Sequence, residues 1–129
     1  MEMEKIRNYI SYFKTIHTET ACRWEGSRKL ESGSFSMPFP VYDTQFLNFI
    51  DDVSNSDLMD VSYGDTLEEY GLEMNSELAK KIDTADFKLV KAILTCYIRQ
   101  ERFCDGLWGR AIKEGIFLTL LKRIEALLS

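Results

Sequence analysis

The chain of 129 residues has little cysteine, one histidine and no long apolar run, and each shortage excludes a class of protein. The three cysteines form no Cys-x-x-Cys pair, and His17 has no clustered partners, so we expect no zinc or other metal centre. The N-terminus has no basic segment followed by an apolar one. Together these features predict a reduced, cytoplasmic protein without structural disulfides.

Catalytic signatures are also missing. The longest apolar stretch, residues 115–121, is interrupted by Thr119 and falls far short of the roughly 20 residues that a membrane-spanning helix needs. There is no Gly-rich phosphate loop, no G-x-S-x-G, no H-E-x-x-H and no dinucleotide fingerprint. We therefore expect no membrane partner and no cofactor, and no established catalytic class is indicated.

Charge is distributed unevenly along the chain, whose net charge is -5. Residues 43–86 carry 2 basic and 12 acidic side chains, whereas residues 87–129 carry 8 basic and 4 acidic ones. The length and the 45% hydrophobic content predict one globular domain over residues 1–129, and the charge segregation predicts a dipolar one.

The hydrophobic spacing predicts a mainly α fold, a single-domain orthogonal helical bundle around a central helix. Apolar side chains recur at helical spacing over residues 4–17, after Asp43 and in the leucine-rich tail that follows Gly115. Asp43 is the expected N-cap of its helix, with Tyr42 and Leu47 as a hydrophobic staple. Residues 54–75 favour short helical turns and loops, and a short helix is expected from Leu107.

Residues 18–42 lack this periodicity and are rich in turn-forming residues. Pro38 and Pro40 restrict the residues before them to an extended path. We expect a long irregular arm with aromatic anchors that can hold a short strand pair.

The central helix is predicted over about residues 83–103. Asp83 and Asp86 resemble a capping box at its start, and Gly106 suits a left-handed cap after its end. A helical wheel places almost all other positions on an apolar arc, but gathers one polar and basic stripe: Lys88, Lys91, Thr95, Arg99 and Arg102.

Glu101 violates this pattern, because it falls on the apolar arc of the central helix. Burying an unpaired carboxylate costs several kcal/mol, so Glu101 needs a partner from another segment. The candidates are Arg23 or Arg28 in the arm, Arg110 beyond the turn, or backbone donors.

Two interpretations remain open for this end of the helix. In the first, Glu101, Arg99 and Arg102 form an ion-pair network that ties the arm to the central helix. In the second, the same charges line a cleft and hold a polar or anionic ligand, for which arginine is well suited. Trp24 is either an aromatic anchor or part of a lid, and Tyr42 is either a half-buried phenol or a donor in a pocket. The candidate ligand-binding residues are Arg99, Glu101, Arg102, Trp24, Tyr42 and Asp105.

The run from Arg99 to Gly106 reads R-x-E-R-F-x-x-G, and with Trp24-Glu25-Gly26 and residues 37–42 it resembles a family of small prokaryotic proteins of unknown function. The likeness spans about residues 24–121. It implies no reaction, substrate or cofactor.

Three functions are compatible with these observations. The leading hypothesis is a cytosolic binding or interaction domain with a polar pocket or partner surface at the Arg99/Glu101/Arg102 end of the central helix. The alternative is a small enzyme of hydrolase or transferase type with Glu101 as acid or base. Nucleic-acid binding through the basic stripe is the third, and the overall acidity argues against it. The last helix either completes the core or pairs two subunits in a homodimer.

Overall fold

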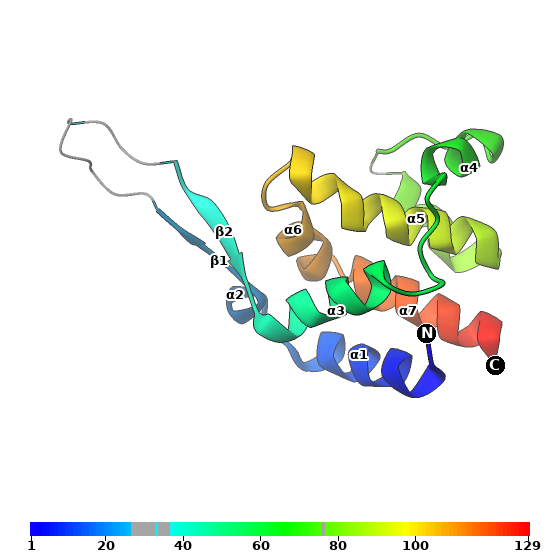
Figure 1. The fold of residues 1–129 in the computed structure, drawn as a ribbon, viewed down its shortest axis with the longest axis horizontal. Helices are drawn as coiled ribbons and strands as arrows, with labels where there is room; N and C mark the ends of the chain where they lie inside the picture. Colours follow the sequence, from blue (N-terminus) through cyan, green and yellow to red (C-terminus); the bar gives the residue numbers. More distant parts are fainter. Residues whose placement is uncertain (27–32, 34–36, 76) are drawn as a thin grey trace.

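A computed structural model describes residues 1–26, 33, 37–75 and 77–129 (Figure 1). Over these residues the fold consists mainly of helices, with one antiparallel strand pair, so the predicted fold class is confirmed. The α-helices are α1 (Met3–Thr15), α2 (Thr18–Ala21), α3 (Thr44–Ser54), α4 (Tyr63–Glu69), α5 (Phe87–Gln100), α6 (Leu107–Lys113) and α7 (Ile116–Leu128); two 3₁₀ helices are η1 (Leu78–Thr84) and η2 (Glu101–Phe103), and the strands are β1 (Cys22–Glu25) and β2 (Phe39–Tyr42).

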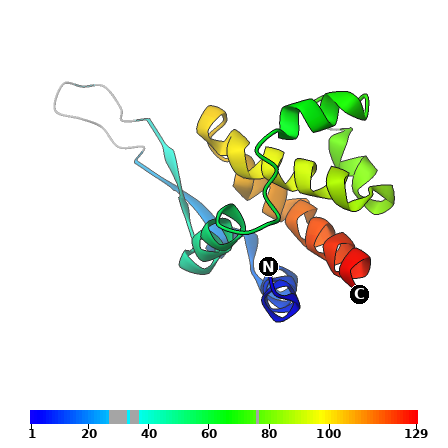
Figure 2. The same ribbon diagram turned by 45° about the vertical axis from the view of Figure 1, so that its right-hand side comes forward.

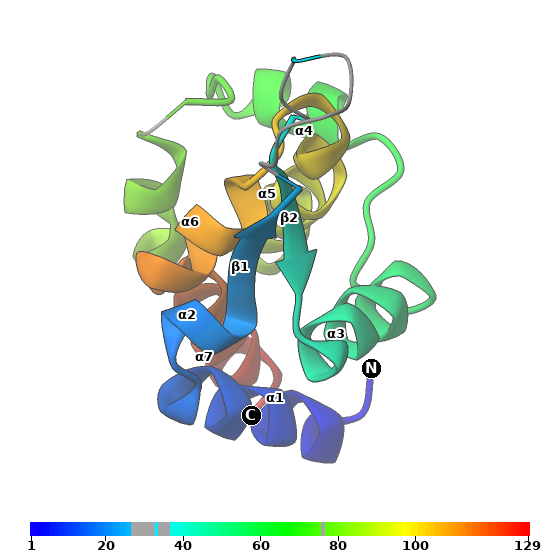
Figure 3. The ribbon, with the colours of Figure 1, turned by 90° about the vertical axis from the view of Figure 1, so that its left-hand side faces the viewer.

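Helix α5 lies between α4 and α7, and α1 packs along α7 (Figures 1 and 2). The strand pair leaves the helical body between α2 and α3, beside α6 (Figure 3). Its register places Cys22 opposite Tyr42 and Glu25 opposite Phe39. Of the helices formed by the described residues, none combines the length and the hydropathy that crossing a bilayer requires.

The core is built around an aromatic cluster where α1, α3 and α7 meet. Four phenylalanines that are at most 9% exposed form this cluster: Phe13, Phe46, Phe49 and Phe117. The centroids of their rings lie 5.0 to 6.2 Å apart. The edge-to-face pairs of this cluster, Phe13–Phe46, Phe13–Phe49 and Phe49–Phe117, add to the free energy gained from burial. Helix α7 also buries Leu120, Leu121 and Ile124 completely, so the core accounts for its apolar face.

The start of the central helix differs from the prediction. Helix α5 begins at Phe87, and Asp86 is its N-cap, with the Asp86 carboxylate accepting a hydrogen bond of 2.9 Å from the Leu89 amide. The predicted start at Asp83 is wrong, because residues 78–84 form η1 and the backbone of Ala85 and Asp86 is extended. An extended pair of residues interrupts the helical hydrogen bonds, so Asp83 belongs to a separate turn.

Asp43, the N-cap residue of α3, also differs from the prediction in the hydrogen bond that its side chain makes. Asp43 occupies the capping position, but its carboxylate accepts from the Tyr12 hydroxyl at 2.8 Å and makes no hydrogen bond to an α3 amide. Of the two residues of the expected staple, Tyr42 packs on Phe46 and Leu47 is 44% exposed. The Asp43 side chain therefore joins α1 to α3.

The aromatic cluster predicts that truncating two adjacent side chains of α3 has very different effects on stability. Phe46→Ala should lower the free energy of unfolding by roughly 3–5 kcal/mol, because it leaves a cavity in a packed core. Leu47→Ala, at an exposed position, should lower it by less than about 1 kcal/mol. Urea denaturation followed by circular dichroism measures both, and equal losses would contradict this description of the core.

Candidate functional site

Glu101 is held by three hydrogen-bond donors from segments beyond its own helical turn. The Tyr42 hydroxyl donates to Oε2 at 2.9 Å, the Gly106 amide to the same oxygen at 3.0 Å, and the Trp108 amide to Oε1 at 2.9 Å. Hydrogen bonds to a carboxylate are shorter and stronger than those between neutral groups. One side chain thus fastens the strand pair, the turn after η2 and the first turn of α6 together.

The glycine of the sequence motif completes this arrangement. Gly106 has a φ of +89°, in the left-handed region where a side chain is strained, as the sequence predicted. A Cβ atom at Gly106 would lie 2.5 Å from Cζ2 of Trp24, so the indole packs directly over the bare backbone. The Glu and Gly of the motif therefore have structural roles: Gly106 turns the chain, and Glu101 accepts its amide.

Tyr42 sits in a half-buried aromatic setting at the base of the arm. Its ring lies 5.3 Å from Trp108 and 5.4 Å from Phe46, and its hydroxyl faces Glu101. Burial, followed by the hydrogen bond to the Glu101 carboxylate, raises the pKa of Tyr42 far above its ordinary value of 10.0. The phenol therefore remains a neutral donor. Trp108 is fixed in turn by a hydrogen bond of 2.9 Å from its indole nitrogen to the Tyr97 carbonyl.

Among the described residues, none of the candidate arginines forms an ion pair with Glu101. Among the described residues Arg23 pairs with Glu25 at 3.4 Å, and Arg110 makes no salt bridge. Arg28 lies outside the described residues. Backbone donors, the remaining candidate, supply two of the three hydrogen bonds, because α5 ends at Gln100 and the η2 turn directs Glu101 toward α6.

Arg99 and Arg102 lie apart from Glu101. They line a hollow of about 380 Å³ between α5 and the segment that leads into α4, together with Asp60, Val61, Tyr63, Thr95 and Phe103. Neither guanidinium has a carboxylate within 4.0 Å among the residues described. The structure thus splits the six candidates: Trp24, Tyr42 and Glu101 form the support of the turn, Arg99 and Arg102 face the hollow, and Asp105 is an exposed turn residue.

The basic stripe is less exposed than the helical wheel predicted. Thr95 is fully buried, and its hydroxyl donates to the Lys91 carbonyl and accepts from the Asp60 amide. Lys88 pairs with Glu69 of α4 at 2.8 Å. Among the pairs seen in the described part of the chain, Lys91, Arg99 and Arg102 have no carboxylate partner. Lys91 instead donates to the Asp57 backbone carbonyl at 3.5 Å, which leaves the two arginines as the cations of the stripe that line a hollow without a hydrogen bond to a described residue.

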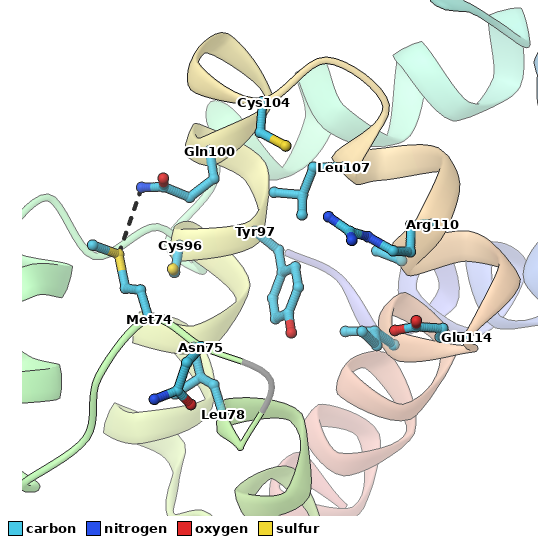
Figure 4. Close-up of a pocket in the computed structure, with 12 residues that line it drawn as sticks. Met74, Asn75, Leu78, Cys96, Tyr97, Gln100, Cys104, Leu107, Arg110 and Glu114 are labelled. Carbon is cyan, nitrogen blue, oxygen red and sulfur yellow. Dashed lines mark hydrogen bonds between the residues drawn. The ribbon is translucent and has the colours of Figure 1, made fainter.

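A second hollow, which sequence analysis missed, lies on another side of α5. It has a volume of about 320 Å³ and is bordered by α5, α6, η1 and residues 74–75 (Figure 4). Its polar lining includes Asn75 and Gln100 as well as Tyr97, Arg110 and Glu114. The one available signal was the spacing of Arg110 and Glu114, which places opposite charges one turn apart on α6.

Over residues 1–129 the chain matches a family of unknown function, DUF6508, and it belongs to that family. No curated protein matches the chain, and no solved structure does. The family assigns no chemistry to any residue, so functional arguments rest on the geometry described above.

The Tyr42–Glu101 hydrogen bond predicts a pH-dependent stability difference. Tyr42→Phe should lower the free energy of unfolding at pH 7 by roughly 1.5–3 kcal/mol, since it removes a hydrogen bond to a charged acceptor. Above pH 10 the phenol ionises in the unfolded chain while it stays neutral in the folded one, so the advantage of the natural protein should shrink by about 1.4 kcal/mol per pH unit.

Tyr70→Phe is the matched control for this experiment, because the Tyr70 hydroxyl donates to Asp86 at an exposed position. Its effect on stability at pH 7 should be much smaller. Urea denaturation at pH 7 and between pH 9.5 and 11 measures both variants. A Tyr42→Phe loss that matches that of Tyr70→Phe, or that stays constant with pH, would contradict the role assigned to Glu101.

The contact between Trp24 and Gly106 predicts a second contrast. Gly115→Ala should cost about 1 kcal/mol, because Gly115 also has a positive φ but no neighbour within 4 Å of a Cβ atom. Gly106→Ala should cost roughly 1–3 kcal/mol more, owing to the overlap with the indole. In a Trp24→Ala background, Gly106→Ala should lose this extra cost, because the indole that overlaps the new methyl group is gone. Thermal unfolding measures the stability of each variant, and an extra cost that persists without Trp24 would contradict the contact.

Proposed function

We propose that this protein is a cytoplasmic interaction domain that binds an acidic segment of a partner protein at the hollow lined by Arg99 and Arg102. The observation that carries the proposal is the absence, among the described residues, of a carboxylate paired with either guanidinium. Two arginines three positions apart, with no carboxylate partner among the described residues, offer strong anion-binding capacity.

The acidic side chain that lines the same hollow is engaged elsewhere. Asp60 lines the same hollow, but its carboxylate accepts from the Ser62 amide at 2.9 Å and from the Thr66 hydroxyl at 2.7 Å. These bonds orient Asp60 toward the start of α4. With no carboxylate of the described residues paired to them, Arg99 and Arg102 can form bidentate hydrogen bonds with carboxylates of a partner.

Apolar side chains beside the arginines indicate a peptide rather than a simple anion. Phe103 is 74% exposed and Val61 is 89% exposed, and both border the hollow. The Arg102 guanidinium lies 5.6 Å from the centre of the Phe103 ring. Large exposed apolar groups next to arginine are typical of interface centres, so the expected partner segment carries an apolar anchor among acidic residues.

The competing functions have weaker support. Nucleic-acid binding needs a continuous basic surface, whereas Lys88 is paired with Glu69 and residues 43–86 are strongly acidic. The enzyme hypothesis relied on Glu101, whose two oxygens accept three hydrogen bonds that hold the turn. The free thiols of Cys22, Cys96 and Cys104 favour a reducing compartment.

Panning a random peptide library on the natural protein tests this proposal. The selected peptides should be enriched in Asp and Glu beside an aliphatic or aromatic residue. Their affinity, measured by fluorescence anisotropy, should fall at least about 10-fold for Arg99→Ala/Arg102→Ala, because two charge-assisted contacts are lost, and should also fall with rising salt.

Lys113→Ala/Lys122→Ala is the control, since it removes the same charge from exposed positions on α6 and α7. It should change peptide affinity less than about threefold. Enrichment of basic or uncharged peptides, or equal losses in the two double variants, would overturn the proposal.

A further inference from the structure

The hollow between α5 and α6 is separate from the one lined by Arg99 and Arg102. Its volume of about 320 Å³ is at the lower end of the range for small-molecule pockets, about 300–1,000 Å³. Leu78, Cys96 and Ile116 line it and are at most 7% exposed, so an apolar group that enters meets packed core side chains. Such a pocket suits a small ligand with an apolar body.

Polar groups of opposite charge border the same pocket. Arg110 of α6 and Glu114 at its C-cap extend toward the side of the pocket on which Tyr97 lies, and the Tyr97 hydroxyl points into the space between the helices (Figure 4). Arg110 and Glu114 lie four positions apart, yet they form no ion pair within 4.0 Å. The Tyr97 hydroxyl makes no hydrogen bond with a described residue; it is the Tyr97 carbonyl that accepts from Trp108. A cation, an anion and a hydroxyl are thus available to one ligand.

The charges of Arg110 and Glu114 both influence the Tyr97 hydroxyl. Burial and then the Cys96 thiol and the Glu114 carboxylate raise the pKa of Tyr97, while the Arg110 guanidinium opposes them. The phenol therefore stays neutral and lies within the electrostatic reach of both charges. A ligand of a single charge would be attracted by one of these groups and repelled by the other.

We propose that this pocket binds a small zwitterion with an apolar side chain, of the size and charge pattern of a free aliphatic or aromatic amino acid. Arg110 binds the carboxylate, Glu114 binds the ammonium group, and the Tyr97 hydroxyl hydrogen-bonds to the polar end. The side chain of the ligand packs against Leu78 and Ile116. This inference goes beyond the proposed partner surface and rests on different residues.

Two matched sets of probes test the charge pattern. L-leucine, 4-methylpentanoate and 3-methylbutylamine share one apolar body, as do L-phenylalanine, 3-phenylpropanoate and 2-phenylethylamine. In each set the zwitterion should bind at least about 10-fold more tightly than the acid or the amine, since it alone satisfies both charges. Dissociation constants come from NMR titration of the ¹⁵N-labelled protein, with shifts expected in α5 and α6.

Two variants separate the roles of the charges. Arg110→Met should weaken zwitterion and acid binding at least about 10-fold while it spares the amine, and Glu114→Gln should weaken zwitterion and amine binding while it spares the acid. Lys113→Met, at an exposed position on the same helix, is the control and should change none of them. NMR spectra of each variant verify its fold.

The outcomes distinguish this inference from the proposed function. Equal binding of the three members of a set, absence of binding of both zwitterions at 10 mM, or equal effects of Arg110→Met and Lys113→Met would overturn it. Arg99→Ala/Arg102→Ala should leave zwitterion binding unchanged, so failure of the peptide experiment would not remove the pocket, and failure here would not remove the peptide surface.

Discussion

The hydrogen bonds to the Glu101 carboxylate are the interaction on which the candidate-site end of the molecule depends. They join the strand pair through Tyr42, the turn through Gly106 and the start of α6 through Trp108. Three elements that pack only partly on each other thus share one charged acceptor. Removing the acceptor would leave a half-buried hydroxyl and two amides without partners, a larger penalty than the loss of one contact.

The turn that Glu101 holds separates two surfaces. Arg99 and Arg102 face the hollow beside α4, whereas Arg110 and Glu114 face the pocket between α5 and α6. Gln100 lies where the two sides meet, because its amide donates to the Tyr63 hydroxyl at 3.2 Å and to the Met74 sulfur at 3.5 Å. Both proposed binding surfaces therefore depend on the same short segment for their shape.

Local signals predicted much of the fold, and competition among polar groups explains the errors. Apolar periodicity located α1, α3, α5 and α7, and glycine identified the left-handed turn at Gly106. The capping positions were harder. Asp43 and Asp86 both precede helices, but one carboxylate accepts from Tyr12 and the other from the backbone. Which donor binds the carboxylate depends on the side chains that tertiary packing brings near it. Sequence spacing alone therefore could not distinguish the role of Asp43 from that of Asp86.

For the candidate site, the sequence by itself determined that Glu101 needs a partner, because a carboxylate placed among apolar positions must be compensated. It also located the arginines near that turn. Only the tertiary structure decided that Tyr42 and backbone amides are the partners, and that Tyr97 and Glu114 border one pocket. The physical reason is that the directions of side chains after a helix end depend on how the next helix packs, and that packing involves residues far apart in the chain.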